Sequence, residues 1–261
     1  MNPRLRFLVS AALCCGLSFS AAAHADALAN IKKAGVLRVA VPQDFPPFGS
    51  VGADLKPQGY DIDVAAMLAR DLGVKLALTP VTSANRVPFL TTGKVDLVIS
   101  SLGKNPEREK VLDFSVAYAP FYNGVFGPAG ASVANVAALA GKTIAVTRGS
   151  VEDLELSKVA PASAVIKRFE DNNSTVSAYY SGQVQLIATG NVVAAALKKR
   201  DTQKSLETKF LIKDSPCFIG INKNEPQLLA RVNAAVASAR KSGELNRISL
   251  RWLNTPLPAA F

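Results

Sequence analysis

The residues best suited to chemistry are serines, glycines and arginines that follow strand-like segments. Residues 100–108 come directly after an apolar segment and include Ser101, Gly103 and Arg108. A guanidinium forms a bidentate, charge-assisted pair with a carboxylate, and hydroxyls and glycine amides donate further hydrogen bonds. Ligands of open α/β sheets bind at the carboxyl ends of the strands, so this segment predicts a carboxylate site. The alternative is a polar loop in which Arg108 pairs with a neighbouring glutamate.

A similar arrangement opens the second half of the chain. Arg148, Gly149 and Ser150 join a strand-like segment to a helical one. Free backbone amides and the positive end of a helix dipole favour an anion at such a junction. The alternative is an ordinary helix N-cap at Ser150. The GxGxxG and GxxxxGK[ST] fingerprints are absent from the sequence, which disfavours a nucleotide ligand.

Two more segments could contribute to the same site. Ser83 and Arg86 lie at another strand-to-helix junction, where a cation in the first helical turn is unfavourable for the dipole. Arg86 is therefore either exposed to solvent or directed at an anion. Phe45, within the sequence Phe-Pro-Pro-Phe, is either a rigid aromatic wall of the site or part of the core.

The first 25 residues have the pattern of a secretory signal peptide. Arg4 and Arg6 precede a short apolar run that ends in an A-x-A site before Asp26. Cleavage there removes His24, the only histidine, and leaves Cys217 as the only cysteine. A chain without histidine excludes Ser-His and Cys-His catalysis and His-ligated metal sites, and a single cysteine excludes an internal disulfide. We therefore expect a periplasmic protein without a cofactor or metal.

The charge pattern favours a small anionic ligand over a nucleic acid. Loss of the signal peptide lowers the formal net charge from +10 to +8. The basic residues are dispersed, and their one run, residues 198–200, ends a predicted helix, where cations suit the dipole. No apolar stretch beyond the signal peptide is long enough to span a bilayer. We expect a monomer that binds no nucleic acid.

Strand-like and helical segments alternate along the chain and must position these residues. The alternation predicts βαβ units and mainly parallel sheets, and it restarts after residues 127–130 without a long linker. Two successive α/β units indicate two lobes that share crossing strands. The predicted strands are 36–41, 76–81, 95–99, 142–147, 165–169, 184–188 and 218–221. The predicted helices are 60–72, 84–92, one beginning at 150, 174–180, 192–199, 226–241 and 244–252.

At these segments the sequence resembles the polar amino-acid-binding proteins of bacterial ABC importers, the type 3 family of extracellular solute-binding proteins. The resemblance spans about residues 26–252. It rests on the motifs GVLRV (35–39), PPF (46–48), GYDID (59–63), GKVDL (93–97), PER (106–108) and DFS (113–115).

The resemblance implies an α/β, two-lobed periplasmic-binding-protein fold of type II, in which each lobe is a mainly parallel sheet flanked by helices. Lobe 1 would comprise residues 26–124 and 219–261, and lobe 2 residues 125–218. The two crossing strands would lie near residues 121–126 and 217–222. Ligand would close the lobes by hinge motion.

The resemblance also implies roles for the candidate residues. Arg108 matches the arginine that holds the ligand's α-carboxylate, with Ser101 and Gly103 as neighbouring donors. Gly149 and Ser150 match the anion-facing turn of the second lobe.

Other candidates point to an acidic ligand. Ser83 and Arg86 are most similar to a segment of glutamate/aspartate-binding members that contacts the acidic side chain, and Phe45 matches an aromatic packing position. Arg148 adds a third cation near the expected cleft, beside Arg86 and Arg108. With Arg86 and Arg108 both facing the cleft, a ligand with one carboxylate would leave the second arginine desolvated and unpaired, which is costly and favours a ligand with a second acidic group.

The sequence departs from the family pattern at Gly190, where many members carry an aspartate that pairs with the ligand's ammonium group. Asn191 would then offer only a neutral acceptor. Pro42 also replaces a polar ligand contact of several members. We therefore expect acidic amino acids, or a matched dicarboxylate, to bind best, and Gly190→Asp to favour ligands that carry an amine.

The leading hypothesis is a periplasmic solute-binding component of an ABC importer. It would bind an amino acid, with acidic ones favoured, or a related small carboxylate, and deliver it to the permease in the inner membrane. One alternative is an enzyme on the same scaffold, such as a periplasmic cyclohexadienyl dehydratase. Asp44 and Glu152 are its candidate proton donors, and the missing histidine argues against it. A second alternative is a ligand-binding regulator of a membrane sensor.

Overall fold

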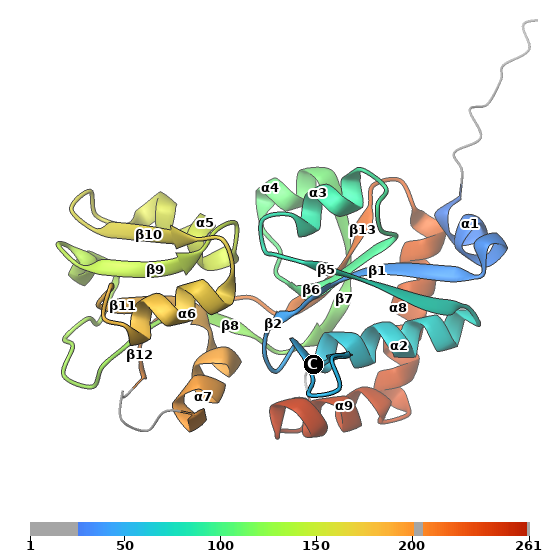
Figure 1. The fold of residues 1–261 in the computed structure, drawn as a ribbon. Coiled ribbons are helices and arrows are strands. Elements are labelled where there is room, and N and C mark those ends of the chain that lie inside the picture. The colour runs from blue at the N-terminus through green and yellow to red at the C-terminus, as the bar shows by residue number, and fades with distance from the viewer. Residues whose placement is uncertain (1–25, 201–205, 260–261) are drawn as a thin grey trace, which may run out of the picture.

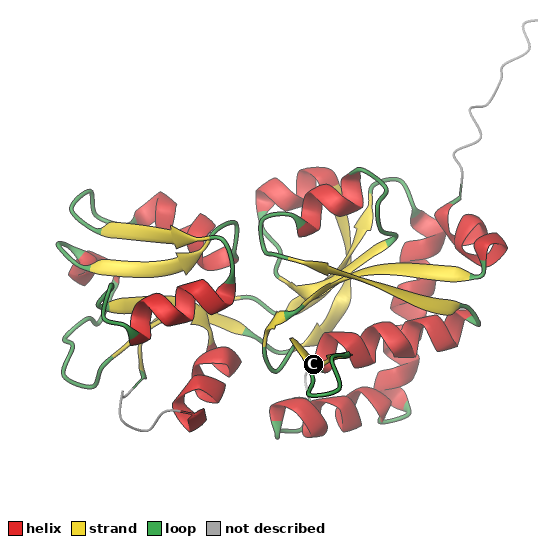
Figure 2. Ribbon diagram, in the orientation of Figure 1, coloured by secondary structure: helices red, strands yellow, loops and turns green. Residues whose placement is uncertain are grey.

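The computed structural model describes residues 26–200 and 206–259, which form two α/β lobes joined by two short connections (Figure 1). Each lobe is a sheet with helices on both faces, as Figure 2 shows. The predicted two-lobed α/β fold is therefore confirmed. The predicted signal peptide, residues 1–25, lies outside the described residues. Within the described ranges, no helix combines the length and apolar character needed to cross a membrane.

Lobe 1 contains a five-stranded sheet in the order β5-β1-β6-β13-β7. Strand β1 is parallel to β5 and β6, and β13 is antiparallel to β6 and β7. Its strands are β1 (Val36–Pro42), β5 (Lys75–Val81), β6 (Leu97–Leu102), β7 (Leu112–Ala119) and β13 (Cys217–Asn222). A small sheet beside it consists of β2 (Asp44–Phe45), β3 (Gly49–Val51) and β4 (Pro57–Gln58).

Helices cover both faces of the lobe 1 sheet (Figure 1). Helices α3 (Arg86–Thr91) and α4 (Pro106–Val111) lie on one face. Helices α2 (Tyr60–Leu72), α8 (Pro226–Lys241) and α9 (Glu244–Leu253) lie on the other, and α1 (Ala27–Ala34) lies at the outer end. Because both faces are covered, the first half of β6 is apolar, and Leu97, Val98 and Ile99 are fully buried.

Lobe 2 contains a second five-stranded sheet in the order β10-β9-β11-β8-β12. Strand β9 is parallel to β10 and β11, and β8 is antiparallel to β11 and β12. Its strands are β8 (Tyr122–Gly127), β9 (Thr143–Thr147), β10 (Val165–Phe169), β11 (Leu186–Gly190) and β12 (Glu207–Asp214). Its helices are η1 (Val136–Leu139), α5 (Val151–Val159), α6 (Asn172–Tyr180) and α7 (Asn191–Arg200).

The chain crosses between the lobes at two adjacent points. It leaves the lobe 1 sheet between β7 and β8, at Pro120 and Phe121, and returns between β12 and β13, at Ser215 and Pro216. The Ser215 amide donates a hydrogen bond to the Phe121 carbonyl at 3.0 Å, so the two connections lie side by side. Strand β8 belongs wholly to lobe 2 and β13 to lobe 1. The change of sheet therefore falls a few residues before the boundaries expected after residues 124 and 218.

Local sequence accounts for the elements that lead into the site. Helix α2 ends at Gly73, whose left-handed φ of 70° suits glycine, as the sequence predicts. Helix α5 begins after Ser150, whose side chain accepts a hydrogen bond from the Asp153 amide. Helix α4 begins after Asn105 with Pro106 in its first turn, an arrangement that favours a helix start. Residues 106–111 are thus a short helix, and the polar-loop alternative for this segment is wrong.

Candidate ligand-binding site

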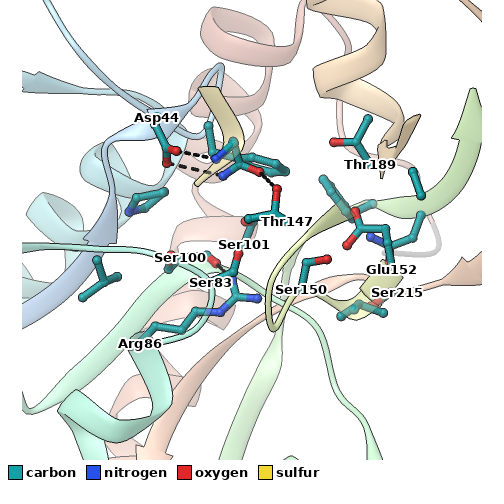
Figure 3. Close-up of a pocket in the computed structure, with 18 residues that line it drawn as sticks. Asp44, Ser83, Arg86, Ser100, Ser101, Thr147, Ser150, Glu152, Thr189 and Ser215 are labelled. Carbon is teal, nitrogen blue, oxygen red and sulfur yellow. Dashed lines mark hydrogen bonds between the residues drawn. The ribbon is translucent and has the colours of Figure 1, made fainter. Parts of the chain in front are cut away.

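A pocket between the lobes, beside the hinge, holds about 510 Å³ of empty space including its open mouth. We call it the interlobe pocket (Figure 3). Its lobe 1 lining is Pro42, Asp44, Phe45, Val81, Ser83, Arg86, Ser100 and Ser101. Its hinge and lobe 2 lining is Phe121, Asn123, Thr147, Ser150, Val151, Glu152, Asn172, Ala188, Thr189 and Ser215. Hydroxyl groups predominate among the polar side chains, which suits a small polar ligand.

The structure divides the ten predicted site residues into two equal groups. Five line the interlobe pocket, and they are Phe45, Ser83, Arg86, Ser101 and Ser150. The other five lie outside it, and they are Gly103, Arg108, Arg148, Gly149 and Asn191. The two groups differ because side chains from the same edge of a sheet point to different partners once the lobes meet.

Arg86 is the arginine that reaches the pocket. Its side chain is buried, with 4% of the residue exposed, and Nη1 donates to the Ser100 carbonyl. Its Nε has no hydrogen-bond partner. Burial lowers the pKa of Arg86, whereas the negative charge of Glu152 acts in the opposite direction. A buried guanidinium with an unused donor on the wall of a pocket is suited to an anionic ligand group.

Arg108 bridges the lobes and does not line the pocket. Its Nη1 donates to the Gly103 carbonyl at 2.7 Å, and its Nη2 donates to the Gly149 carbonyl at 2.9 Å. The first acceptor belongs to lobe 1 and the second to lobe 2. Burial and repulsion from Arg86 lower the pKa of Arg108 to about 9, which leaves it charged at neutral pH. In this arrangement the Arg108 guanidinium holds the two lobes together.

Two glycines allow the lobes to approach each other at this bridge. A Cβ atom on Gly103 would lie 2.2 Å from Ser215 Oγ, and one on Gly149 would lie 3.0 Å from the Cα of Ala84. Gly149 also has a left-handed φ of 72°. Neither residue faces the ligand space. We infer that both serve lobe contact, because a larger residue at either position would push the lobes apart.

A further contact shows that the lobes are drawn together. Asp44 Oδ2 in lobe 1 accepts a hydrogen bond from the Asn172 amide in lobe 2 at 2.6 Å, and its Oδ1 accepts from Asn172 Nδ2 at 3.3 Å. Lys213 Nζ in lobe 2 donates to the Lys104 carbonyl in lobe 1 at 3.0 Å. Because these bonds cross the cleft, the structure represents a closed arrangement of the lobes.

Arg148 lies on the surface of lobe 2. Its Nε pairs with Glu170 Oε1 at 2.7 Å, and about half of its side chain is exposed. An exposed ion pair of this kind contributes little to stability and is not available to a ligand in the pocket. The interlobe pocket therefore contains one arginine and not the three expected from the sequence.

Comparison with known proteins identifies the family. The sequence profile of the bacterial extracellular solute-binding proteins, family 3, matches residues 37–255. The chain belongs to this family. The resemblance found in the sequence motifs is thus confirmed.

Individual relatives of this family 3 protein bind different amino acids. It is 26% identical over 233 residues to the ABC transporter glutamine-binding protein of Bacillus subtilis, covering 87% of this chain and 85% of that protein. It is 26% identical over 277 residues to the glutamate/aspartate import solute-binding protein of Salmonella typhimurium, covering 98% and 91%. The solute receptor for L-cysteine of Neisseria gonorrhoeae has a TM-score of 0.82 at 31% identity, covering 87% and 93%. Because these relatives bind such different ligands, the specificity of this chain has to be inferred from its own pocket.

Gly190, where this family 3 protein departs from the pattern, has no room for a side chain. A Cβ atom there would lie 1.9 Å from Cζ of Phe121, so the hinge aromatic ring fills that space. The adjacent Asn191 accepts a hydrogen bond from the Tyr122 amide at 3.1 Å and supports the hinge. An aspartate at residue 190 would therefore have to displace the Phe121 ring before it could act as an amine partner.

Several lining residues were not predicted as site residues. They are Val81, Ser100, Phe121, Asn123, Thr147, Val151, Asn172, Ala188, Thr189 and Ser215. Phe121 and Ser215 belong to the hinge, whose exact crossing points follow only from the sheet topology. Ala188 and Thr189 lie next to the carboxyl end of β11, and the rule that ligands bind at the carboxyl ends of strands predicts a role for them.

Asp61 holds the pocket wall in place at Ser101. It is fully buried, and its Oδ2 accepts from the Ser101 amide at 2.8 Å while its Oδ1 accepts from the Tyr118 hydroxyl at 2.6 Å. Asp61 lies in the first turn of α2, whose N-cap is Gly59. Ser101 has a φ of 42°, which is uncommon for a non-glycine residue. The bond to Asp61 fixes this backbone at the pocket wall.

The stability of the protein should decrease with rising pH because of Asp61. Burial raises the pKa of its carboxyl to about 7, from an ordinary value of about 3.9. Between these values the folded state holds the proton more tightly than the unfolded chain, so the free energy of unfolding should fall as pH rises from about 4 to 7. Urea unfolding across this range should show a flatter profile for Asp61→Asn than for wild type. Asp54→Asn, in an exposed turn, is the control, and a profile for Asp61→Asn parallel to that of wild type would contradict the assignment.

Proposed function

We propose that this protein binds an amino acid in the interlobe pocket and delivers it, as the periplasmic component, to an ABC importer in the inner membrane. The observation that carries the proposal is the buried Arg86, which lines a pocket bordered by hydroxyls from both lobes and whose Nε has no hydrogen-bond partner. A carboxylate placed at Arg86 would complete its hydrogen bonds in a desolvated site. Family membership and the signal-peptide pattern support the periplasmic location and the role in import.

Other buried polar atoms in the pocket also lack partners. Asn123 Oδ1 and Ser215 Oγ, both on the pocket lining, have no hydrogen-bond partner. Buried polar groups are normally satisfied, so these atoms indicate where a polar ligand binds. Both lie on the hinge and lobe 2 side, opposite Arg86. A ligand that contacts both sides would stabilise the closed arrangement of the lobes.

The charges in the pocket favour a zwitterion over a dianion. The preference expected for a second acidic group depended on Arg86 and Arg108 both facing the ligand, with Arg148 nearby. Of these, Arg86 alone lines the pocket, and the carboxylate of Glu152 lies on the same lining. A second ligand carboxylate would be desolvated near this negative charge, which is unfavourable. We therefore propose an α-amino acid as the ligand class and no longer favour acidic members of that class.

A thermal-shift screen tests the proposal. The probes are the twenty protein L-amino acids, with succinate and glutarate as carboxylates that lack the amine. At 100 times its dissociation constant, a ligand adds about 2.7 kcal/mol to the free energy of unfolding, which raises the melting temperature by roughly 5–10 °C. At least one amino acid should produce such a shift. A shift with dicarboxylates alone, or with no probe, would contradict the proposal.

The same samples separate a binding protein from an enzyme on this scaffold. A transport protein releases its ligand unchanged, whereas a dehydratase would alter it. Mass spectrometry of the ligand recovered after a long incubation should find only the compound that was added. A new product would assign the chain to the enzyme class and would direct attention to the pocket carboxylates, Asp44 and Glu152, as proton donors.

A further inference from the structure

Glu152 is a largely buried residue, and its carboxylate has no hydrogen-bond or salt-bridge partner among the residues that the structure describes. It lies in the first turn of α5 and lines the interlobe pocket, and only 4% of the residue is exposed. Its negative charge acts to raise the pKa of both Arg86 and Arg108, although it makes no direct contact with either guanidinium.

A carboxylate in such a position needs an interaction that compensates for its lost solvation. Removing an ionised carboxyl from water is costly unless a cation or hydrogen-bond donors replace the lost solvent. The N-terminal turn of α5 offers some compensation through the helix dipole, but that effect is small compared with the cost of burial. A ligand cation in the pocket would supply the missing partner.

The other acidic side chain on the pocket lining, Asp44, already has hydrogen-bond partners. Asp44 accepts two hydrogen bonds from Asn172, one from the backbone amide and one from the side chain (Figure 3). At Gly190, the ring of Phe121 takes the space that a side chain would need. Within the described part of the chain, Glu152 is therefore the pocket carboxylate that remains free to bind a cation.

Arg86 and Glu152 reach the pocket from opposite lobes. Arg86 comes from α3 of lobe 1, and Glu152 comes from α5 of lobe 2, as Figure 3 shows. We propose that Glu152 pairs with the α-ammonium group of the amino acid whose carboxylate binds Arg86. This inference rests on the proposed function and adds that the amine is required. A zwitterion would then connect the lobes through its two charged ends, whereas a carboxylate without the amine would engage lobe 1 alone.

Matched ligand pairs test this inference by calorimetry. The probes are L-glutamine with 4-carbamoylbutanoate, L-glutamate with glutarate, and L-lysine with 6-aminohexanoate, which keeps the side-chain ammonium but lacks the α-amine. In wild type, each amino acid that binds should exceed its partner by about 30-fold or more in affinity, the usual effect of leaving one member of a buried charge pair unmatched. Glu152→Gln should reduce amino-acid affinity by a similar factor and change the affinity for the partner compound by less than about threefold.

Two variants and one scattering measurement complete the test. Glu152→Asp keeps the charge and should recover part of the loss. Glu170→Gln removes an exposed acid that pairs with Arg148 on the surface of lobe 2, and it should bind like wild type. By small-angle scattering, wild type should become more compact with the amino acid and not with its deaminated partner. This result does not depend on whether the Glu152 variants fold.

The outcomes separate the two proposals. Binding of amino acids with an unchanged preference for the amine in Glu152→Gln would overturn the role of Glu152 and leave the proposed function intact. Equal binding of 6-aminohexanoate and L-lysine, with loss of both in Glu152→Gln, would overturn the α-amine assignment in favour of a side-chain cation. If none of the twenty amino acids binds to wild type, the proposed function fails, and the assignment of Glu152 fails with it.

Discussion

Replacing Arg86 with methionine should weaken amino-acid binding by about 2–5 kcal/mol, the usual loss when one member of a desolvated charge pair is removed. Arg86 is buried on the pocket lining with an unused Nε donor, so a ligand carboxylate bound there would lose its cation. Methionine retains much of the side chain's apolar bulk and removes its charge. Calorimetry with the amino acid found by the thermal-shift screen measures the loss.

Arg108→Met is the matched comparison, because the family resemblance implies that Arg108 holds the ligand carboxylate, whereas we propose that Arg86 does. The Arg108 guanidinium is bonded to the Gly103 and Gly149 carbonyls across the cleft. Its loss should weaken lobe closure and therefore reduce the affinity for every ligand by a similar factor. Loss of Arg86 should instead reduce the affinity for the free amino acid. It should have little effect on the affinity for the corresponding α-amide, which carries no carboxylate charge.

The two variants should therefore differ in how they change the affinities for the free acid and the amide. A large loss for the free acid in Arg86→Met, with equal losses for acid and amide in Arg108→Met, would support the geometry. Near-normal affinity in Arg86→Met, with an acid-specific loss in Arg108→Met, would mean that Arg108 leaves the Gly149 carbonyl to hold the ligand. The melting temperature of each variant without ligand is the control for folding.

Gly190→Asp should destabilise the protein by at least about 1–3 kcal/mol, the usual effect of inserting atoms into a filled core. A Cβ atom at residue 190 would lie 1.9 Å from the ring of Phe121, which is itself buried against the hinge. The new carboxylate would add a desolvation penalty, so Gly190→Asp should be less stable than Gly190→Ala. Urea unfolding at neutral pH measures both variants.

Gly130 provides the control for these substitutions. A Cβ atom on Gly130 meets no other atom within 4 Å, so Gly130→Ala and Gly130→Asp should have nearly the stability of wild type. Phe121 also lines the interlobe pocket, so its displacement in Gly190→Asp should lower ligand affinity. A Gly190→Asp protein of normal stability with a stronger preference for amines would restore the interpretation drawn from the family pattern.

Local sequence predicts some features near the site and not others. The segment with Arg108 is a helix, and Asn105 followed by Pro106 is a sequence that favours a helix start. Asp61, in contrast, is a fully buried carboxylate with two donors from other elements, which is a tertiary feature. Propensities therefore predict the first feature, whereas the second depends on how the elements pack.

The sequence by itself determined the fold class, the two-lobed organisation and the family. These depend on local properties, namely the alternation of apolar strands with amphipathic helices, and on short motifs distributed over nearly the whole chain. The same properties located the edge of each sheet where polar residues gather. Ser83, Arg86, Ser101 and Ser150 were selected on that basis, and all four line the interlobe pocket.

Only the tertiary structure decided which of the residues at that edge face the ligand space. Arg86 and Arg108 follow β5 and β6, two strands on either side of β1 in one sheet, yet Arg108 turns to a carbonyl that lobe 2 supplies, more than forty residues later in the chain. The space beside Gly190 is filled by a hinge aromatic from another segment. The direction of Glu152 depends on how α5 meets the opposite lobe. Side-chain orientation is set by packing and hydrogen-bond partners that are remote in sequence, so strand and helix patterns carry no information about it.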